Sequence, residues 1–315
     1  MKNIAKQWKI NQPSFEFTSE LPLESSAWSG HYFFAYDLVA NIKPNLIVEL
    51  GTHKGNSLFS FAQAIKDLKL DTELHGIDTW EGDEHAGFYG KEVYETFLEI
   101  KNKYYKDVKI VSHKMLFDEA VDKFEDNSID ILHIDGLHTY DAVKHDFENW
   151  LPKVNKKTGI ILFHDVCEKS DDFGVYKLWE ELKKKYETIT FDHYHGLGVL
   201  FLNRNPFGKN YPSPELLTEY YKKTSEVQDL NKTLNDKDIH IDNLEREILD
   251  RLKTTKELTK QNQELTKQDQ DLKSNLSEKN KELERIYNSK SWKLTQPIRE
   301  FAKIVRDFKN TLKNN

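Results

Sequence analysis

The chain has one cysteine, Cys167, which excludes a framework of intrachain disulfide bonds and any metal site built from paired cysteines. No stretch approaches the roughly 18 consecutive apolar residues that a membrane-spanning helix needs. The N-terminal segment also lacks the apolar core of a secretory signal. The formal net charge is −7, so there is no basic excess for nucleic-acid binding. We therefore expect a cytoplasmic protein without a nucleic-acid partner.

Glycine and proline are absent from residues 215–296, whereas they punctuate the chain before that point. This change in composition divides the sequence, because glycine and proline mark turns and linkers. The predicted parts are an N-terminal helical lead-in or lid at 1–40, an α/β domain at 41–205, a linker at 206–222, a coiled coil at 223–289 and a basic amphipathic tail at 290–315.

The segment 223–289 carries a heptad pattern without a slip in register. With position a at Val227 and position d at Leu230, twelve of the eighteen a and d positions up to Ile286 are apolar. Such a seam predicts self-association through a coiled coil. Asn262 falls at an a position, which is typical of a parallel dimer. The alternative is a single solvated helix.

The most informative motif is a strand that ends in an acid and breaks into glycines. The apolar run at 46–48 is followed by Glu49, Gly51 and Gly55, and a helical pattern follows. This predicts the first βα unit of a doubly wound sheet, in which ligands bind beyond the carboxyl ends of the strands. The glycines permit positive φ and close approach of the backbone to a ligand. The spacing is not that of a dinucleotide fingerprint, and Glu49 favours a cationic ligand.

A second acid, Asp78, ends the next apolar strand, where a carboxylate can accept hydrogen bonds from ribose hydroxyls. Glu-x-Gly-Thr-x-x-Gly-x-Ser followed by Gly-Ile-Asp resembles the S-adenosylmethionine pocket of class I methyltransferases, with His53 in place of the usual middle glycine. The resemblance implies S-adenosyl-L-methionine as cofactor. The residues it implies as cofactor contacts are Glu49, Gly51, Thr52, Gly55, Ser57, Asp78, Thr79, Trp80 and Asp135. The alternative is an ordinary βα turn of another α/β protein.

Seven strands are predicted in the first domain, with helices between most of them. They lie near 46–50, 73–78, 108–112, 129–134, 159–163, 187–192 and 197–202, and the last two face each other across a tight turn. Seven strands with a terminal hairpin are typical of the Rossmann-like methyltransferase sheet, which has helices on both faces. The expected fold is therefore α/β, followed by a long helix and a short basic amphipathic helix.

Titratable residues follow two neighbouring predicted strands. Asp135 comes directly after the strand at 129–134, and His164 and Asp165 come after the strand at 159–163. Carboxylates with an imidazole suit Mg²⁺ or Mn²⁺, which can orient a substrate's oxygens and lower the pKa of a hydroxyl. His138 is placed to act as general base near neutral pH. Alternatively, Asp135 caps the helix that follows.

The run Asp135-Gly-x-His138-x-Tyr140, together with residues 159–165, resembles sugar O-methyltransferases allied to the macrocin and mycinamicin enzymes and to cephalosporin hydroxylase-like proteins. Related domains occur in bacterial surface-polysaccharide clusters. The resemblance implies metal ligation by Asp135 and Asp165, a His138 base and a glycan or glycolipid acceptor. His164 stands where that family has Glu. The alternatives are a hydroxylase-like metal enzyme and a non-catalytic scaffold for a polysaccharide synthesis complex.

Two further regions carry predictions about partners. The loop after the second strand is longer than packing requires, which favours a lid, and the candidate acceptor contacts are His85, Tyr89, Tyr140 and His195. Residues 289–299 resemble a motif that follows coiled coils in polysaccharide-assembly enzymes. The tail beyond has a net charge of +5 over 290–315 and one apolar face formed by Phe301, Ile304, Val305, Phe308 and Leu312. A basic amphipathic helix favours an anionic membrane surface, here the inner face of the cytoplasmic membrane, and a docking site on polysaccharide-assembly enzymes is the alternative.

Overall fold

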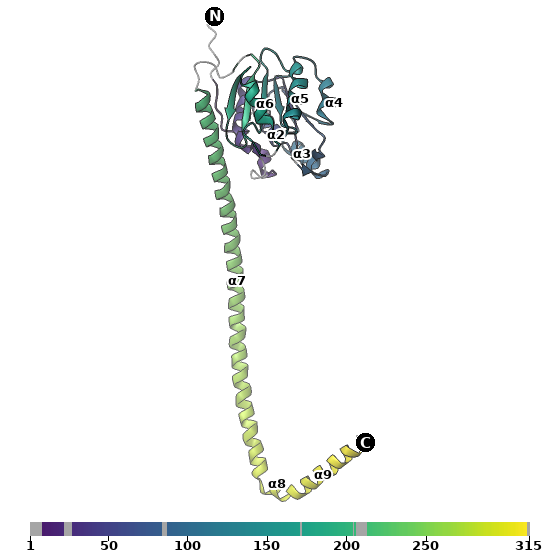
Figure 1. The fold of residues 1–315 in the computed structure, drawn as a ribbon. Coiled ribbons are helices and arrows are strands. Elements are labelled where there is room, and N and C mark those ends of the chain that lie inside the picture. The colour runs from purple at the N-terminus through teal and green to yellow at the C-terminus, as the bar shows by residue number, and fades with distance from the viewer. Residues whose placement is uncertain are drawn as a thin grey trace. The chain divides into compact units, whose positions relative to one another are not determined.

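The computed structural model describes residues 8–21, 27–83, 87–170, 172–203, 205 and 213–313, with side chains up to residue 307. The chain forms two compact units, Met1–Leu234 and Asn235–Asn315. The first contains the sheet, and the described residues of the second form helices (Figure 1).

A seven-stranded sheet has the order β5-β2-β1-β6-β7-β9-β8. The strands run parallel from β5 to β7, and β9 is antiparallel to both β7 and β8. The strand order reverses between β1 and β6, which is where ligands bind in open α/β sheets. The strand bounds are β1 Leu46–Leu50, β2 Glu73–Asp78, β5 Lys109–Lys114, β6 Ile131–Ile134, β7 Ile160–His164, β8 Glu187–Phe191 and β9 Leu197–Phe201.

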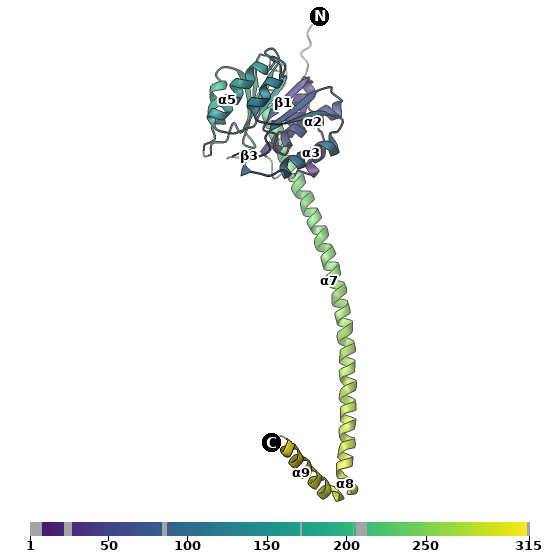
Figure 2. The ribbon, with the colours of Figure 1, turned by 90° about the vertical axis from the view of Figure 1, so that its right-hand side faces the viewer.

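Helices cover both faces of the sheet because consecutive strand residues point to opposite sides. Ile47 packs in the core that lies beneath α1, α2 and α3, whereas Val48 packs in the core beneath α4, α5 and α6. Figure 2 shows α5 on one side of β1 and α2 and α3 on the other. The helix bounds are α1 Tyr32–Ile42, α2 Asn56–Leu68, α3 Glu92–Tyr104, α4 Phe117–Ala120, α5 Tyr140–Trp150 and α6 Val175–Leu182. Short 3-10 helices occupy Glu16–Ser19, Ala27–His31, Val121–Lys123 and Leu151–Lys153.

The predicted fold class is confirmed, and all seven predicted strands are present. The strand predicted at 129–134 begins at Ile131, because Ile129 forms an isolated bridge with Val154 instead. The loop after β2 holds a feature that the pattern did not indicate, a two-stranded ribbon of β3 Gly82–Asp83 and β4 Gly87–Phe88. Strands of two residues leave no period to detect.

The long helix α7, Pro214–Asn288, begins inside the segment 206–222 that the composition marks as a linker. Its first turns are packed rather than free, since Leu217, Tyr221 and Ser225 are buried. The hydroxyl of Tyr221 donates to Asp37 at 2.7 Å and accepts from the indole of Trp8 at 3.0 Å. The beginning of α7 is thus part of the first unit, where Trp8 and Asp37 of the lead-in hydrogen-bond to Tyr221.

In the second unit, α7 continues to Asn288 and is followed by α8, Lys290–Leu294, and α9, Gln296–Lys313. Ser289 caps α8 by accepting the backbone N–H of Trp292 at 3.2 Å. Among the described residues, no helix is both long enough and apolar enough to cross a bilayer.

Candidate functional site

A cavity of about 390 Å³ opens at the carboxyl ends of β1, β2, β6 and β7. Its walls combine the two regions that the sequence singled out, the glycine turn after β1 and the acidic segments after β6 and β7. The lining residues are Ala27, Trp28, Gly51, Thr52, His53, Asn56, Ser57, Asp78, Thr79, Gly82, Asp83, Tyr89, Leu116, Phe117, Asp135, Gly136, Leu137, His138, His164 and Asp165.

The glycine turn owes its composition to close packing within the protein. Gly51 has φ +89°, and a Cβ there would lie 1.9 Å from the carbonyl oxygen of Asp135. Gly55 also has φ +89°, and a Cβ there would meet the rings of Phe59 and Phe97 at 2.6 and 2.9 Å. The sequence predicts that these glycines let the backbone approach a ligand closely. In the structure, contacts within the protein already require the missing side chain, at the end of β6 for Gly51 and in the aromatic core for Gly55.

His53 adopts φ +47°, a left-handed conformation that explains why a glycine is usual at this position. Two hydrogen bonds hold the turn in place. The backbone N–H of His53 donates to Asp78 at 2.7 Å, and the indole of Trp80 donates to the carbonyl of His53 at 2.7 Å. The other Asp78 oxygen accepts the N–H of Trp80 at 2.7 Å. Each carboxylate oxygen of Asp78 therefore keeps a further lone pair for a ligand hydroxyl.

Three predicted cofactor residues lie behind the described lining. Glu49 is fully buried and pairs with His133 at 2.9 Å. Burial raises the pKa of Glu49, although the His133 hydrogen bond opposes this. Gly55 is the N-cap of α2, and Trp80 is buried with its indole bonded to the turn. The structure thus gives these residues supporting positions, whereas Gly51, Thr52, Ser57, Asp78, Thr79 and Asp135 line the cavity itself.

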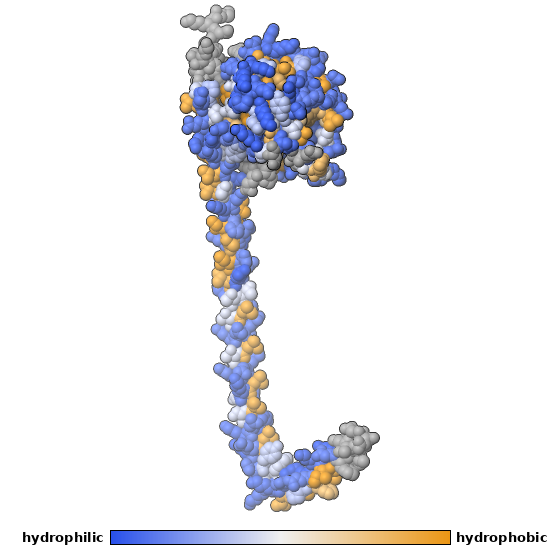
Figure 3. All heavy atoms as spheres, in the orientation of Figure 1, coloured by the Kyte–Doolittle hydropathy of each residue, from blue (hydrophilic) through white to orange (hydrophobic). Residues whose placement is uncertain are grey.

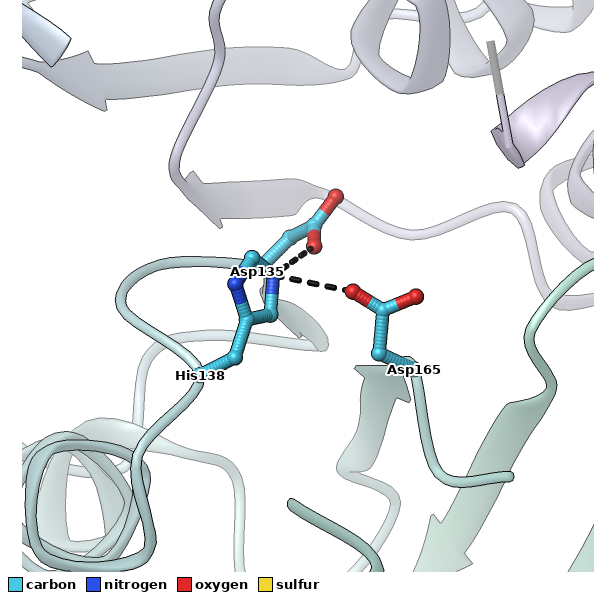
Figure 4. Close-up of side chains that lie close together, drawn as sticks. All are labelled: Asp135, His138 and Asp165. Carbon is cyan, nitrogen blue, oxygen red and sulfur yellow. Dashed lines mark ion pairs between the residues drawn. The ribbon is translucent and has the colours of Figure 1, made fainter. Parts of the chain in front are cut away.

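Four titratable side chains meet at the ends of β6 and β7. Nε2 of His138 lies 2.9 Å from a carboxylate oxygen of Asp165 and 3.5 Å from one of Asp135. Figure 4 shows its imidazole facing both carboxylates. Nδ1 of His164 lies 3.3 Å from an oxygen of each carboxylate. Asp165 has φ +59°, the kind of uncommon backbone conformation that concentrates at functional sites.

Asp135 is not the cap of the helix that follows it. The N-cap of α5 is Thr139, whose hydroxyl accepts the N–H of Ala142 at 3.4 Å. The side chain of Asp135 is instead directed to the two histidines. This geometry removes the capping alternative and leaves Asp135 as a member of the cluster.

The pKa shifts of the four side chains favour two ionised carboxylates, Asp135 and Asp165, paired with two protonated imidazoles. Burial alone would lower the pKa of His138, but hydrogen bonds to Asp135 and Asp165 outweigh it and raise the pKa to about 9. Burial would also lower the pKa of His164, but the charges of Asp135 and Asp165 outweigh this effect and raise the pKa to about 10. Burial would raise the pKa of Asp165, yet the charge of His164 brings it down to about 2. The pKa of Asp135 falls well below its usual range for the same reason, against the opposing effect of burial.

Within the described part of the chain, the group that could hold a metal ion consists of Asp135, His138 and Asp165, each offering one ligand atom within 4.8 Å of the others. The predicted set had His164 in place of His138. Two carboxylates and one imidazole suit Mn²⁺ or a similar divalent ion. The donor set therefore fits a cation, with His138 as a candidate ligand as well as a candidate base.

The four predicted acceptor contacts have different locations. Tyr89 lines the cavity and packs against His53, with ring centroids 5.1 Å apart. The hydroxyl of Tyr140 donates to Glu181 at 3.0 Å, and His195 pairs with Glu168 at 2.7 Å; neither belongs to the described lining. His85 lies outside the described residues.

Sequence reasoning missed part of the wall. Trp28 lines the cavity with its indole donating to Ser60 at 3.1 Å. Its ring packs in a tilted arrangement against His133 and His164, at centroid distances of 4.5 and 5.5 Å. The density of aromatic residues before residue 40 was the available signal. Phe117 and Leu137 add apolar surface. Leu137 is the unspecified position of the Asp135-Gly-x-His138 run, so the motif was the available signal for it, whereas the sequence around Phe117 carried no such signal.

Comparison with known proteins finds similarity in the central part of this domain. Residues 48–166 match the family model described as a methyltransferase domain. The uncharacterized protein y4gI of Sinorhizobium fredii is 45% identical over 176 residues, which is 56% of this chain and 19% of that protein. The chain therefore spans about a fifth of the length of this curated relative.

Solved structures of methyltransferases are also similar. The O-methyltransferase TomG from Streptomyces achromogenes, solved with SAM and involved in tomaymycin synthesis, is 16% identical; the match covers 60% of this chain and 94% of TomG, with a TM-score of 0.41. The SAH-bound methyltransferase PaMTH1 from Podospora anserina is 15% identical; the match covers 60% of this chain and 86% of PaMTH1, with a TM-score of 0.43.

Proposed function

We propose that this protein is an S-adenosylmethionine-dependent O-methyltransferase that acts on a sugar hydroxyl of a bacterial surface polysaccharide or glycolipid. The observation that carries the proposal is that one cavity holds both Asp78, at the end of β2, and the Asp135–His138–Asp165 cluster. The match of residues 48–166 to a methyltransferase domain supports the same chemistry.

The cofactor would lie along the β1 turn. Asp78 would accept the ribose hydroxyls with the lone pairs that His53 and Trp80 leave available. The lining residues Gly51, Thr52 and Ser57 are placed to contact the rest of the cofactor. Acidic groups around the cavity would favour a ligand that carries a positive sulfonium centre.

The acceptor hydroxyl would be held near Asp135, His138 and Asp165. In-line transfer at the sulfonium methyl depends mostly on positioning, because oriented reactants need no further ordering to react. With its pKa at about 9, His138 carries a proton at neutral pH as the cluster stands. A divalent ion held by the two carboxylates with His164 would stabilise an acceptor alkoxide and offset the carboxylate charge that keeps His138 protonated, so that His138 could take the hydroxyl proton. An ion that instead took His138 as its third ligand would lower the pKa of the hydroxyl itself and leave His138 no role as base.

The test is an acceptor screen with methyl-labelled S-adenosylmethionine, run on a panel of nucleotide sugars, oligosaccharides and lipid-linked glycans. We expect label in a sugar methyl ether with the wild-type protein and with Asp118→Asn, which removes an exposed carboxylate that does not line the cavity. Asp135→Asn should lose transfer. Cofactor binding without transfer to any sugar would favour the scaffold alternative, and label on a non-sugar hydroxyl would keep the reaction but overturn the acceptor class.

A further inference from the structure

From Leu234 to its end, α7 exposes its whole apolar stripe. The apolar a and d residues from Leu234 to Ile286 are 43–68% exposed. Figure 3 shows hydrophobic surface recurring along α7. An apolar stripe that stays exposed to water over many turns of one helix is energetically unfavourable, so another surface is expected to cover it. The residues are Leu234, Ile241, Leu244, Ile248, Leu258, Leu265, Leu272, Leu276, Leu283 and Ile286.

We propose that a second copy of this chain covers this stripe, in a parallel coiled coil paired in register. The argument for a second copy is the spacing itself. The a and d positions keep a strict repeat of seven from Val227 to Ile286, and only a helix with the same repeat can fill such a seam along its whole length. A globular partner would need no such period.

Charged residues within the seam would oppose in-register pairing if each faced its own copy with an uncompensated charge. The structure shows a compensating partner for three of them on the same helix. Arg251 donates to Glu247 at 2.6 and 3.1 Å, Asp269 pairs with Lys273 at 2.7 Å, and Lys279 pairs with Glu282 at 2.9 Å.

Each of these partners occupies an e or g position, at the border of the seam. The charged groups of the three seam residues are therefore directed to the edge of the seam, where they remain in water. The aliphatic parts of the arginine and lysine side chains can still pack within the seam. Asn262 then faces its own copy at a position a, where paired side-chain amides hydrogen-bond and fix the register. These features favour parallel pairing over an antiparallel arrangement, in which a positions meet d positions and Asn262 could not pair with its own copy.

The experiment uses the full chain with Cys167→Ser, so that no native thiol remains. In this background, Asn262→Cys places a thiol at a seam position and Gln263→Cys places one at the neighbouring b position as the matched control. Mild oxidation should convert nearly all of the Asn262→Cys protein, and little of the control, to a disulfide-linked dimer. Analytical ultracentrifugation of the wild-type chain should give a dimer.

Leu265→Glu should shift that dimer to monomer at micromolar concentration, whereas Gln263→Glu should not. Retention of the first unit's thermal unfolding transition would show that the variants remain folded. A wild-type chain that is monomeric at every concentration would overturn the proposal. A dimer in which the Asn262→Cys thiols do not cross-link would overturn the parallel register.

A different observation carries a second proposal, which concerns α9. Ile298, Phe301, Ile304 and Val305 are 41–69% exposed and recur at helical spacing. The helix starts from a fixed bend, since the guanidinium of Arg299 lies 3.6 Å from the ring centroid of Trp292 and donates to its carbonyl at 2.7 Å. The segment 290–315 has seven basic and two acidic residues.

We propose that this face of α9 binds an anionic lipid bilayer surface. The sign of the charge is the argument for lipid, because the chain as a whole is acidic whereas the segment that carries this apolar face has a net charge of +5. Each contact of this kind is weak and reversible. A parallel dimer would present two copies of α9 together and raise the effective concentration of the second.

The test is co-sedimentation of the full chain with two kinds of vesicle, one of phosphatidylcholine alone and one that also contains about 30% phosphatidylglycerol, an anionic lipid. We expect binding to the anionic vesicles only, release at high salt, and at least a tenfold loss of binding in Phe301→Ser/Ile304→Ser. Asn310→Ser, on the opposite side of the helical wheel, is the matched control and should bind normally. Equal binding by the double variant, or no binding of the wild type to anionic vesicles, would overturn the proposal; in the second case a protein partner becomes the occupant to seek.

Discussion

Gly51 and Asp135 meet at the point where β1 and β6 end side by side. The backbone N–H of Asp135 donates to the carbonyl of Leu50 at 2.9 Å, and the missing side chain of Gly51 leaves room for the Asp135 carbonyl oxygen. This contact joins the cofactor turn to the acidic cluster. The two halves of the proposed active site are thus positioned by one backbone approach.

Gly51→Ala should be strongly destabilising, because its φ of +89° is strained for alanine and its Cβ would lie 1.9 Å from the Asp135 oxygen. We expect a loss of about 2–4 kcal/mol in the free energy of unfolding, since strain and overpacking each cost about 1–3 kcal/mol. Urea denaturation measures it. The matched control is Gly87→Ala, which has φ +79° but nothing within 4 Å of the added Cβ. Equal losses in both variants would show that the contact with Asp135 is unimportant.

His138→Ala should preserve cofactor binding and lower turnover about 10²–10⁴-fold, the usual effect of removing a general base. His145→Ala is the control, because His145 belongs to α5 but is exposed and pairs with Asp118. Steady-state kinetics with labelled cofactor would separate kcat from KM. A turnover within twofold of wild type would remove His138 from the chemistry.

Stability should fall as the pH rises from about 7 to 10. The pKa values of His138 and His164 in the folded state are about 9 and 10, above the ordinary value of 6.5 in the unfolded chain. In this window the native state binds more protons than the unfolded state, so the stabilisation that is complete below pH 6.5 disappears as the pH passes 9 to 10. Urea unfolding in the presence of chelator should show a smaller decline for His138→Gln than for wild type. Parallel pH profiles would contradict the ion-paired cluster.

Divalent metal should bind the Asp135, His138 and Asp165 group, and this can be measured without activity. We expect Mn²⁺ to raise the unfolding temperature of wild type and of Asp118→Asn, but not of Asp165→Asn, because a ligand that binds only the native state stabilises it. Chelator should reduce the rate of methyl transfer. If Mn²⁺ shifts no variant and chelator leaves the rate unchanged, the reaction proceeds without an ion and the cluster orients the acceptor alone.

The strands of the sheet could be predicted from the sequence because buried parallel strands are nearly continuous apolar runs. Ile131–Ile134 and Ile160–His164 show this, and each directs its acid to the ligand edge by topology alone. The meeting of Asp135, His138 and Asp165 could be predicted for the same reason. Which histidine completes the possible metal group could not, because it depends on side-chain directions at the ends of two strands.

Other features depended on tertiary contacts with no local pattern. Trp28 reaches the cavity from the lead-in, and Tyr221 anchors the start of α7 on Asp37, 184 residues away in sequence. Glu49 precedes the glycine turn as a cofactor residue would, yet a buried contact with His133 turns it away from the lining. Such long-range pairs can be found only when the fold is known.

The central claim, an S-adenosylmethionine site at the end of β2, is tested most directly by titration calorimetry of the cofactor into the full chain. We predict one cofactor bound per chain in wild type and in Asp71→Ala, whose side chain is exposed. Asp78→Ala should weaken binding by about 1–3 kcal/mol, the range for a lost charged hydrogen bond. No heat of binding in a folded wild-type protein, or an unchanged affinity in a folded Asp78→Ala variant, would contradict the account.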